Sequence, residues 1–125
     1  MKLAPDGSFI IGKAGIQMNT LGKDNGKVMR VSRDGKSAEM IGYGFRSPYL
    51  GVHPKTGLIT ASDQQGYYTP TTPLQVVRDH QFYGFLPSIQ PKEKYPAPIA
   101  EPLTWIPYPI NASGANQVWL DPATV

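Results

Sequence analysis

Residues that could bind a ligand are concentrated in one stretch of the chain, residues 42–84. An Arg-Ser-Pro corner stands at residues 46–48, and a polar Ser-Asp-Gln-Gln-Gly loop follows at residues 62–66. A guanidinium group matches the geometry of a carboxylate, and amide and carbonyl oxygens accept hydrogen bonds or bind cations. The apolar runs at residues 49–52 and 58–61 are bounded by Gly and Pro, which predicts strands. The sequence therefore predicts a binding site on loops held by a rigid sheet.

Other catalytic chemistry has little support in the sequence. The two histidines, His53 and His80, stand in turn-like contexts, and we expect surface residues there rather than a general base. The chain contains no cysteine, which excludes disulfides, a zinc–thiolate site, a covalent c-type haem attachment and a cysteine nucleophile in this segment.

Length and composition indicate one folded domain of the all-β class. The 125 residues leave no room for two ordinary domains. The 13 glycines and 13 prolines disfavour long helices. An apolar content of 40% with 17% charged residues argues against disorder.

The order of the expected elements follows from apolar runs and turn signals. An Asp-Gly pair at Asp34 predicts a hairpin. Seven prolines between Pro87 and Pro109 predict a long ordered meander through which no sheet runs. The expected strands cover residues 9–11, 27–32, 38–41, 49–52, 58–61, 74–77 and 117–120.

A weak internal repeat supports a more specific architecture. The Pro-Gly turn and apolar run that begin at Pro5 recur at Pro54, about 50 residues later, with about four strands per repeat. This period is typical of β-propeller blades, although any β protein rich in such turns could show a similar pair. We therefore expect a partial propeller. Residues 1–26 would end one blade and form a linker, 27–85 a blade with the binding loops, 86–116 the meander, and 117–125 the start of the next blade.

The final predicted strand and the charge distribution set further expectations. A strand that starts at residue 117 has little to pair with, so we expect the chain to be a piece of a larger protein.

The net charge is +3, and the basic residues between Lys23 and Lys36 include no aromatic platform, so we expect a solvated hairpin face and no nucleic-acid partner. No run approaches a membrane span, and the first residues do not form a signal peptide.

The ordered set of residues 44–49, 62–66 and 82–84 resembles the glucose/sorbosone dehydrogenase-like quinoprotein family. The similarity is greatest to a branch of large secreted bacterial propeller proteins, often fused to a cytochrome c domain. The resemblance implies a six-bladed β-propeller that oxidises a small sugar or alcohol with pyrroloquinoline quinone (PQQ) and calcium. It also implies a periplasmic or secreted location, a cytochrome c domain as electron acceptor, and further blades outside this chain.

The same resemblance assigns candidate site residues. Arg46, Ser47, Gln64 and Gln65 would contact the cofactor, and the carbonyls of Gly66 and Tyr67 would bind the calcium ion.

These assignments leave alternatives open. Arg46 could instead pair with Asp63 or cap a strand end, and Asp63 and Gln64 could satisfy loop backbone groups. The catalytic histidine and the acid cluster of the family are missing from this chain, so we assign no catalytic residue and expect no turnover by this chain alone. The alternative function is a non-catalytic propeller that binds a glycan or a protein through the same loops.

Overall fold

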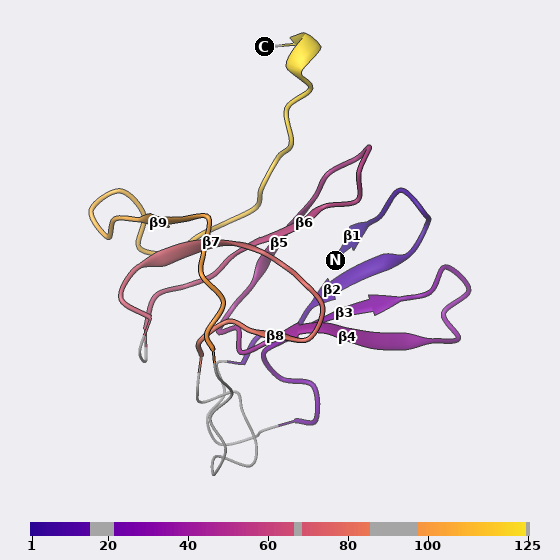
Figure 1. Ribbon diagram of the computed structural model, residues 1–125, viewed down its shortest axis with the longest axis horizontal. Coiled ribbons are helices and arrows are strands. Elements are labelled where there is room, and N and C mark those ends of the chain that lie inside the picture. Colours follow the sequence, from indigo (N-terminus) through magenta and orange to yellow (C-terminus); the bar gives the residue numbers. More distant parts are fainter. Residues whose placement is uncertain (16–21, 67–68, 86–97, 125) are drawn as a thin grey trace.

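The computed structural model describes residues 1–15, 22–66, 69–85 and 98–124, and within these ranges the protein is all-β (Figure 1). The strands form one sheet of five strands and one of four. The helical structure in these ranges is a single 3₁₀ turn, η2, at Pro122–Thr124. The all-β prediction is confirmed.

The first sheet is an antiparallel meander with one added strand. Its order is β1-β2-β3-β4-β8, and β8 runs parallel to β4. Gly7, in the β1–β2 turn, and Gly35, in the β3–β4 turn, have φ of +84° and +71°, a conformation that glycine adopts without strain. The strands are β1 (Lys2–Leu3), β2 (Phe9–Gly12), β3 (Lys27–Val31), β4 (Ala38–Tyr43) and β8 (Gln81–Phe82).

The second sheet is antiparallel throughout, in the order β5-β6-β7-β9. The turn between β5 and β6 contains Gly57 at φ +73°, and the amide of His53 donates to the carbonyl of Leu58 at 2.8 Å. The strands are β5 (Tyr49–Val52), β6 (Ile59–Ser62), β7 (Thr72–Val76) and β9 (Thr104–Ile106).

The six strands expected between residues 9 and 77 are all present, with ends shifted by two residues or fewer. The repeat also has a structural counterpart, because the turns at Pro5 and Pro54 close the first hairpin of each sheet. Four strands, β2 to β5, lie between these two turns, as the repeat predicted.

Two expectations in the C-terminal part are wrong. Residues 117–120 form no strand, because this segment crosses the face of the second sheet instead of pairing along an edge. A strand does form within the proline-rich region, where β9 pairs with β7. Pro102 and Pro107 flank β9 rather than interrupt it, so neither removes a hydrogen bond from within the strand.

The core lies between the two sheets and fixes the start of β5. The ring of Phe45, fully buried, stacks on Tyr83 with centroids 4.5 Å apart. Gly44, at φ +84°, precedes it, and a Cβ there would lie 2.2 Å from the ring of Phe82. The chain therefore turns closely around the aromatic cluster before it enters the Arg46 corner. The other core residues are Ala4, Ile10, Val28, Ile41, Leu50, Ile59, Ala61 and Val77.

Candidate functional site

The two polar segments singled out in the sequence lie together, and a buried carboxylate joins them. Asp63 is 5% exposed and follows directly after β6. It accepts backbone hydrogen bonds from Arg46 (2.7 Å), Ser47 (2.6 Å) and Gln64 (2.8 Å). These bonds fix the corner at residues 46–48 against the loop at residues 63–66. We call this arrangement the corner–loop site.

The register of the second sheet explains why the two segments meet. Tyr49, the first residue of β5, pairs with Ser62, the last residue of β6. The corner before β5 and the loop after β6 therefore leave the sheet at the same end. All four residues of β6 are buried, which makes the strand that carries Asp63 a rigid support.

The Arg46 side chain reaches across the loop. Its Nη1 donates a hydrogen bond to the carbonyl of Gln65. The guanidinium also lies against Gly66, where a Cβ would stand 2.6 Å from Nη1 and where φ is +128°. Glycine at this position therefore allows both the backbone conformation and the close approach of the cation.

The expected ion pair between Arg46 and Asp63 takes a different form. Asp63 binds the backbone N–H of Arg46, while the Arg46 guanidinium bonds to a loop carbonyl. Burial raises the pKa of Asp63 above 3.8, and the N–H donors of Ser47, Arg46 and Gln64, together with the Arg46 charge, oppose that rise. Asp63 thus accepts hydrogen bonds from backbone N–H groups of the loop and the corner, as one of the alternatives predicted.

The two glutamines have different surroundings. Gln64 Nε2 donates to Ser113 Oγ at 3.1 Å, which links the loop to the C-terminal segment. Gln65 Oε1 is buried and has no hydrogen-bond partner among the described residues. A buried carbonyl oxygen without a partner is costly, so this atom is an acceptor that a ligand, or a residue outside the described ranges, could satisfy.

Of the two predicted calcium ligands, only Gly66 lies in the described residues, so the calcium ion stays a prediction. Calcium takes six to eight oxygen ligands, whereas the carbonyl of Gly66 already accepts from the Thr69 amide at 3.2 Å. The Arg46 cation binds the neighbouring carbonyl of Gln65, and the Asp63 carboxylate accepts from three amides. Tyr67, the second predicted calcium ligand, lies outside the described residues. No group of three or more His, Asp or Glu side chains comes together in the ranges that the structure covers.

Both histidines lie in turns away from the corner–loop site. His53 lies in the β5–β6 turn, at the opposite end of β5 from the corner, and its Nδ1 accepts from the amides of Lys55 (3.2 Å) and Thr56 (3.1 Å). His80 is an exposed turn residue at φ +60° between β7 and β8. Neither is placed to act as a general base in the corner–loop site.

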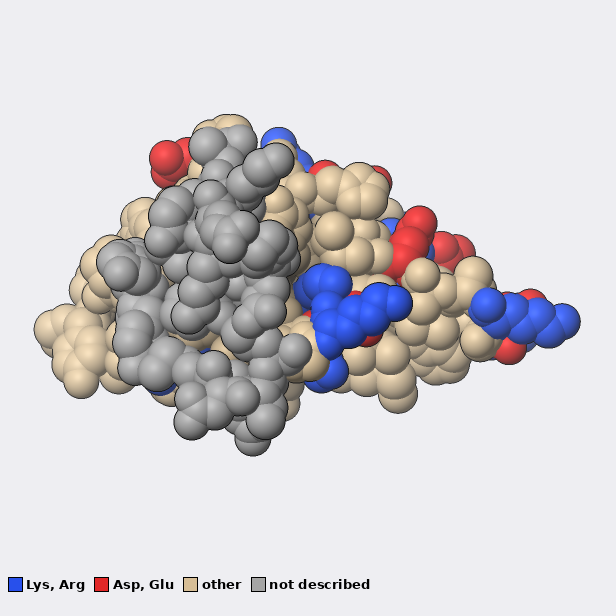
Figure 2. Space-filling model, turned by 90° about the horizontal axis from the view of Figure 1, so that it is seen from below, with Lys and Arg blue, Asp and Glu red and all other residues tan. Residues whose placement is uncertain are grey.

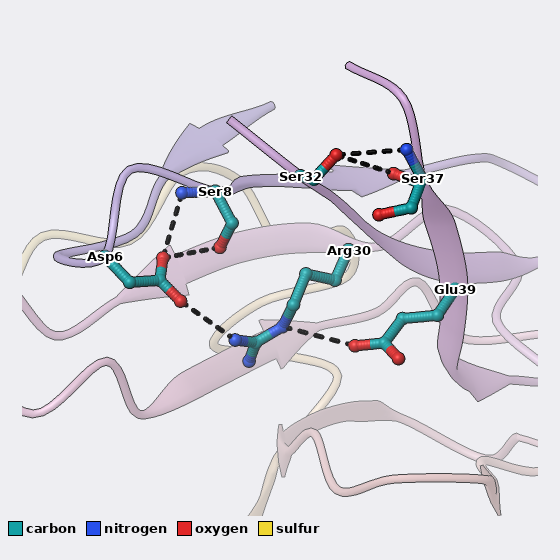
Figure 3. Close-up of polar contacts among 6 residues, drawn as sticks. All are labelled: Asp6, Ser8, Arg30, Ser32, Ser37 and Glu39. Atoms are coloured by element: carbon teal, nitrogen blue, oxygen red, sulfur yellow. Dashed lines mark hydrogen bonds and ion pairs between the residues drawn. The ribbon is translucent and has the colours of Figure 1, made fainter. Parts of the chain in front are cut away.

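The basic hairpin face carries mixed charge. Arg30 lies between Asp6 (3.3 Å) and Glu39 (3.8 Å), beside a hydrogen-bonded pair of serines (Figure 3). Lys27 pairs with Asp24 at 3.1 Å. On the face shown in Figure 2, Lys and Arg atoms stand next to Asp and Glu atoms rather than in a patch of one sign. This mixed charge fits the expected solvated hairpin face.

A concave region elsewhere on the molecule was not predicted from the sequence. A cleft of about 490 Å³ lies on the outer face of the second sheet, beneath the segment 111–119. Hydroxyls of the sheet hold that segment: Thr60 bonds to Gln117 Oε1 at 2.5 Å, and Ser62 to the carbonyl of Ala115 at 3.2 Å. Thr60 and Ser62 are two residues apart in β6, so both hydroxyls lie on one face of the sheet. This spacing could have indicated a polar contact on that face from the sequence alone.

Comparison with known proteins gives this chain no relative. No family model, no curated protein and no solved structure matches it. In the described ranges there is also no helix of the length and apolar character that crossing a membrane requires.

Proposed function

We propose that the two sheets are consecutive blades of a larger β-propeller related to the quinoprotein dehydrogenases, and that the corner–loop site binds the quinone cofactor. The observation that carries the proposal is the convergence of Arg46, Gln65 and Gly66 around the buried carboxylate of Asp63. These are residues that the resemblance assigned to the cofactor face, and they come from two separate segments.

The blade architecture is supported by how successive elements stack. Each sheet contains four antiparallel strands and opens with an equivalent hairpin. The first strand of the second sheet lies against the first sheet, where Leu50 approaches Gly12. A propeller blade packs against its neighbour in the same face-to-face manner. The remaining blades would come from outside these two sheets.

The ligand chemistry follows from the polar groups of the site. PQQ is a planar quinone with three carboxylates, and a guanidinium is well suited to bind such groups. Arg46 is partly exposed and makes one side-chain hydrogen bond within the described residues, so it retains N–H donors for a ligand. Gln65 Oε1 offers an acceptor. A bound quinone would supply the oxidising chemistry, while this chain would hold and orient it. The calcium ion and the cytochrome c acceptor stay predictions from the resemblance.

A second candidate function, recognition without catalysis, is favoured by one specific observation. The Asp63 carboxylate, which is the one acidic side chain in the corner–loop site, accepts three backbone hydrogen bonds and is not available as a base. The same site would then hold an acidic glycan or an acidic protein segment through Arg46. Both functions predict that this chain alone does not oxidise sugars or alcohols.

Titration of the protein with PQQ by isothermal calorimetry tests the proposal. Arg46→Ala should weaken binding about tenfold or more, since one charge-assisted hydrogen bond contributes about 1.5–3 kcal/mol. Lys36→Ala removes the same charge from an exposed hairpin tip and should leave the affinity unchanged. Equal affinities of wild type and Arg46→Ala would overturn the assignment. Binding of an acidic oligosaccharide but not of PQQ would select the second candidate.

A further inference from the structure

The outer face of the first sheet, which points away from the second, is apolar except for Lys27 at the start of β3. Cross-strand neighbours in an antiparallel sheet share a face, and the register places the side chains of β1 to β4 accordingly. Leu3 is 65% exposed, and most of the others are half-buried. A contiguous apolar surface of this kind marks a site of interaction with a partner. Its members are Leu3, Phe9, Ile11, Met29, Val31, Ala38 and Met40.

The outer face of the second sheet is concave, and its cleft is lined by apolar side chains as well as by the polar groups that hold the C-terminal segment. Leu74, Leu103 and Ile106 line the cleft together with Val118. Val118 is 81% exposed and Leu120 is 68% exposed. The indole Nε1 of Trp119, also at this cleft, is buried without a hydrogen-bond partner in the described part of the chain.

The contact between the two sheets of one chain shows how these outer faces could be covered. β5 runs along the β1–β2 hairpin, with Leu50 beside Gly12 and Gly57 beside Pro5. The C-terminal segment runs along the β5–β6 hairpin in the same direction. Its residues approach the sheet in order along the hairpin: Gly114 at Ser62, Gln117 at Gly51, and Trp119 with its ring 4.8 Å from His53. The C-terminal segment thus occupies, on the second sheet, the place that β5 occupies on the first.

We propose that the chain assembles head to tail with further copies of itself, the outer face of β1–β4 of one copy covering the cleft of the next. The proposal rests on the blade architecture proposed above and names the partner that completes it. Residues 117–120 of one copy would then lie at the β1 edge of the next copy, where β1 spans only Lys2–Leu3, and could add a strand there. Because propellers close with four to eight blades, two sheets per chain give a ring of two to four copies.

Light scattering coupled to size-exclusion chromatography tests the proposal. Wild-type protein should form one discrete species with two to four times the 13.7 kDa mass of the chain. Leu3→Lys and Val118→Lys each place a charge on one of the two faces and should each yield monomers. Ile110→Lys changes an equally exposed apolar residue (76%) outside the cleft lining and should leave the assembly intact.

A mixture of the two face variants distinguishes head-to-tail contact from other modes. Each variant retains one intact face, so an equimolar mixture should form a 1:1 dimer. Association of Val118→Lys by itself would indicate contact between like faces and would overturn the proposal. Monomeric wild type, or open-ended growth with concentration, would also overturn it. Circular dichroism of each variant checks that it is folded. Titration of the monomeric variants with PQQ tests the corner–loop site separately, so a failure of the assembly and a failure of the ligand assignment can be told apart.

Discussion

Replacement of Asp63 tests whether its carboxylate joins the corner and the loop of the corner–loop site. In Asp63→Asn the remaining oxygen can keep two of the hydrogen bonds, because Ser47 and Gln64 both donate to Oδ1. The new amide NH₂ would face the N–H of Arg46, which donates to Oδ2 in the wild type. One buried donor is then left without an acceptor, which costs about 1–3 kcal/mol. Asp63→Ala leaves all three N–H donors without an acceptor and should lower the free energy of unfolding by about 3–5 kcal/mol.

Urea unfolding followed by circular dichroism measures both values. The free energy of unfolding should decrease in the order wild type, Asp63→Asn, Asp63→Ala. Asp79→Asn changes an exposed carboxylate after β7 and serves as the control, because its free energy of unfolding should change little. Equal destabilisation by Asn and Ala would contradict the assignment of two bonds to one oxygen and one to the other. No destabilisation by either would refute the view that this carboxylate joins corner and loop.

The pH dependence of the same variant provides an independent check. Burial raises the pKa of Asp63 in the folded protein above 3.8, so the folded state binds a proton at a pH where the unfolded chain has lost it. Wild type should therefore gain stability relative to Asp63→Asn as the pH falls from the folded pKa to 3.8. The surface aspartates Asp6, Asp24 and Asp34, whose pKa values are lowered, are present in both proteins and cancel. A relative loss of stability in that window would mean that the amide donors outweigh burial.

Three further substitutions address the core and the C-terminal segment. Gly44→Ala should destabilise the protein by about 2 kcal/mol or more in urea unfolding, because φ is +84° and the new methyl would overlap the ring of Phe82. Tyr83→Phe should cost about 1–3 kcal/mol by the same assay, because its hydroxyl bridges two backbone groups at 2.7 and 2.9 Å; a neutral effect would contradict that bridge. Gln117→Ala removes the side chain that bonds to both Thr60 and the Tyr49 carbonyl, so limited proteolysis near residue 117 should become faster while the sheet core stays resistant.

The sequence predicted the longer strands well because their signals are local. The runs at residues 49–52 and 58–61, for example, are rich in apolar residues and lie between Gly and Pro turns. The short strands β1, β8 and β9 were not predicted, since two or three residues carry no periodicity and depend on a partner strand. The strand predicted at residues 117–120 was wrong for a related reason: its β-forming residues are present, but hydroxyls of β6 and the carbonyl of Tyr49 bind the segment across the sheet.

The candidate site was predicted as a set of residues but not as an arrangement. The sequence identified Arg46 and the loop at residues 62–66 as neighbours in a site, and they do lie together. It did not indicate that Asp63 would hold them through backbone amides, because that depends on the register of β5 and β6. The link from Gln64 to Ser113 joins residues 49 positions apart and has no local signal.

The most direct measurement of the central claim is the NMR response of backbone amides to PQQ. The account predicts that added PQQ shifts the amide signals of Arg46, Ser47, Gln64 and Gly66, while those of the outer cleft, such as Gln117 and Val118, stay in place. Shifts confined to the outer cleft, or no shifts at saturating PQQ, would contradict the assignment of the corner–loop site as the cofactor face.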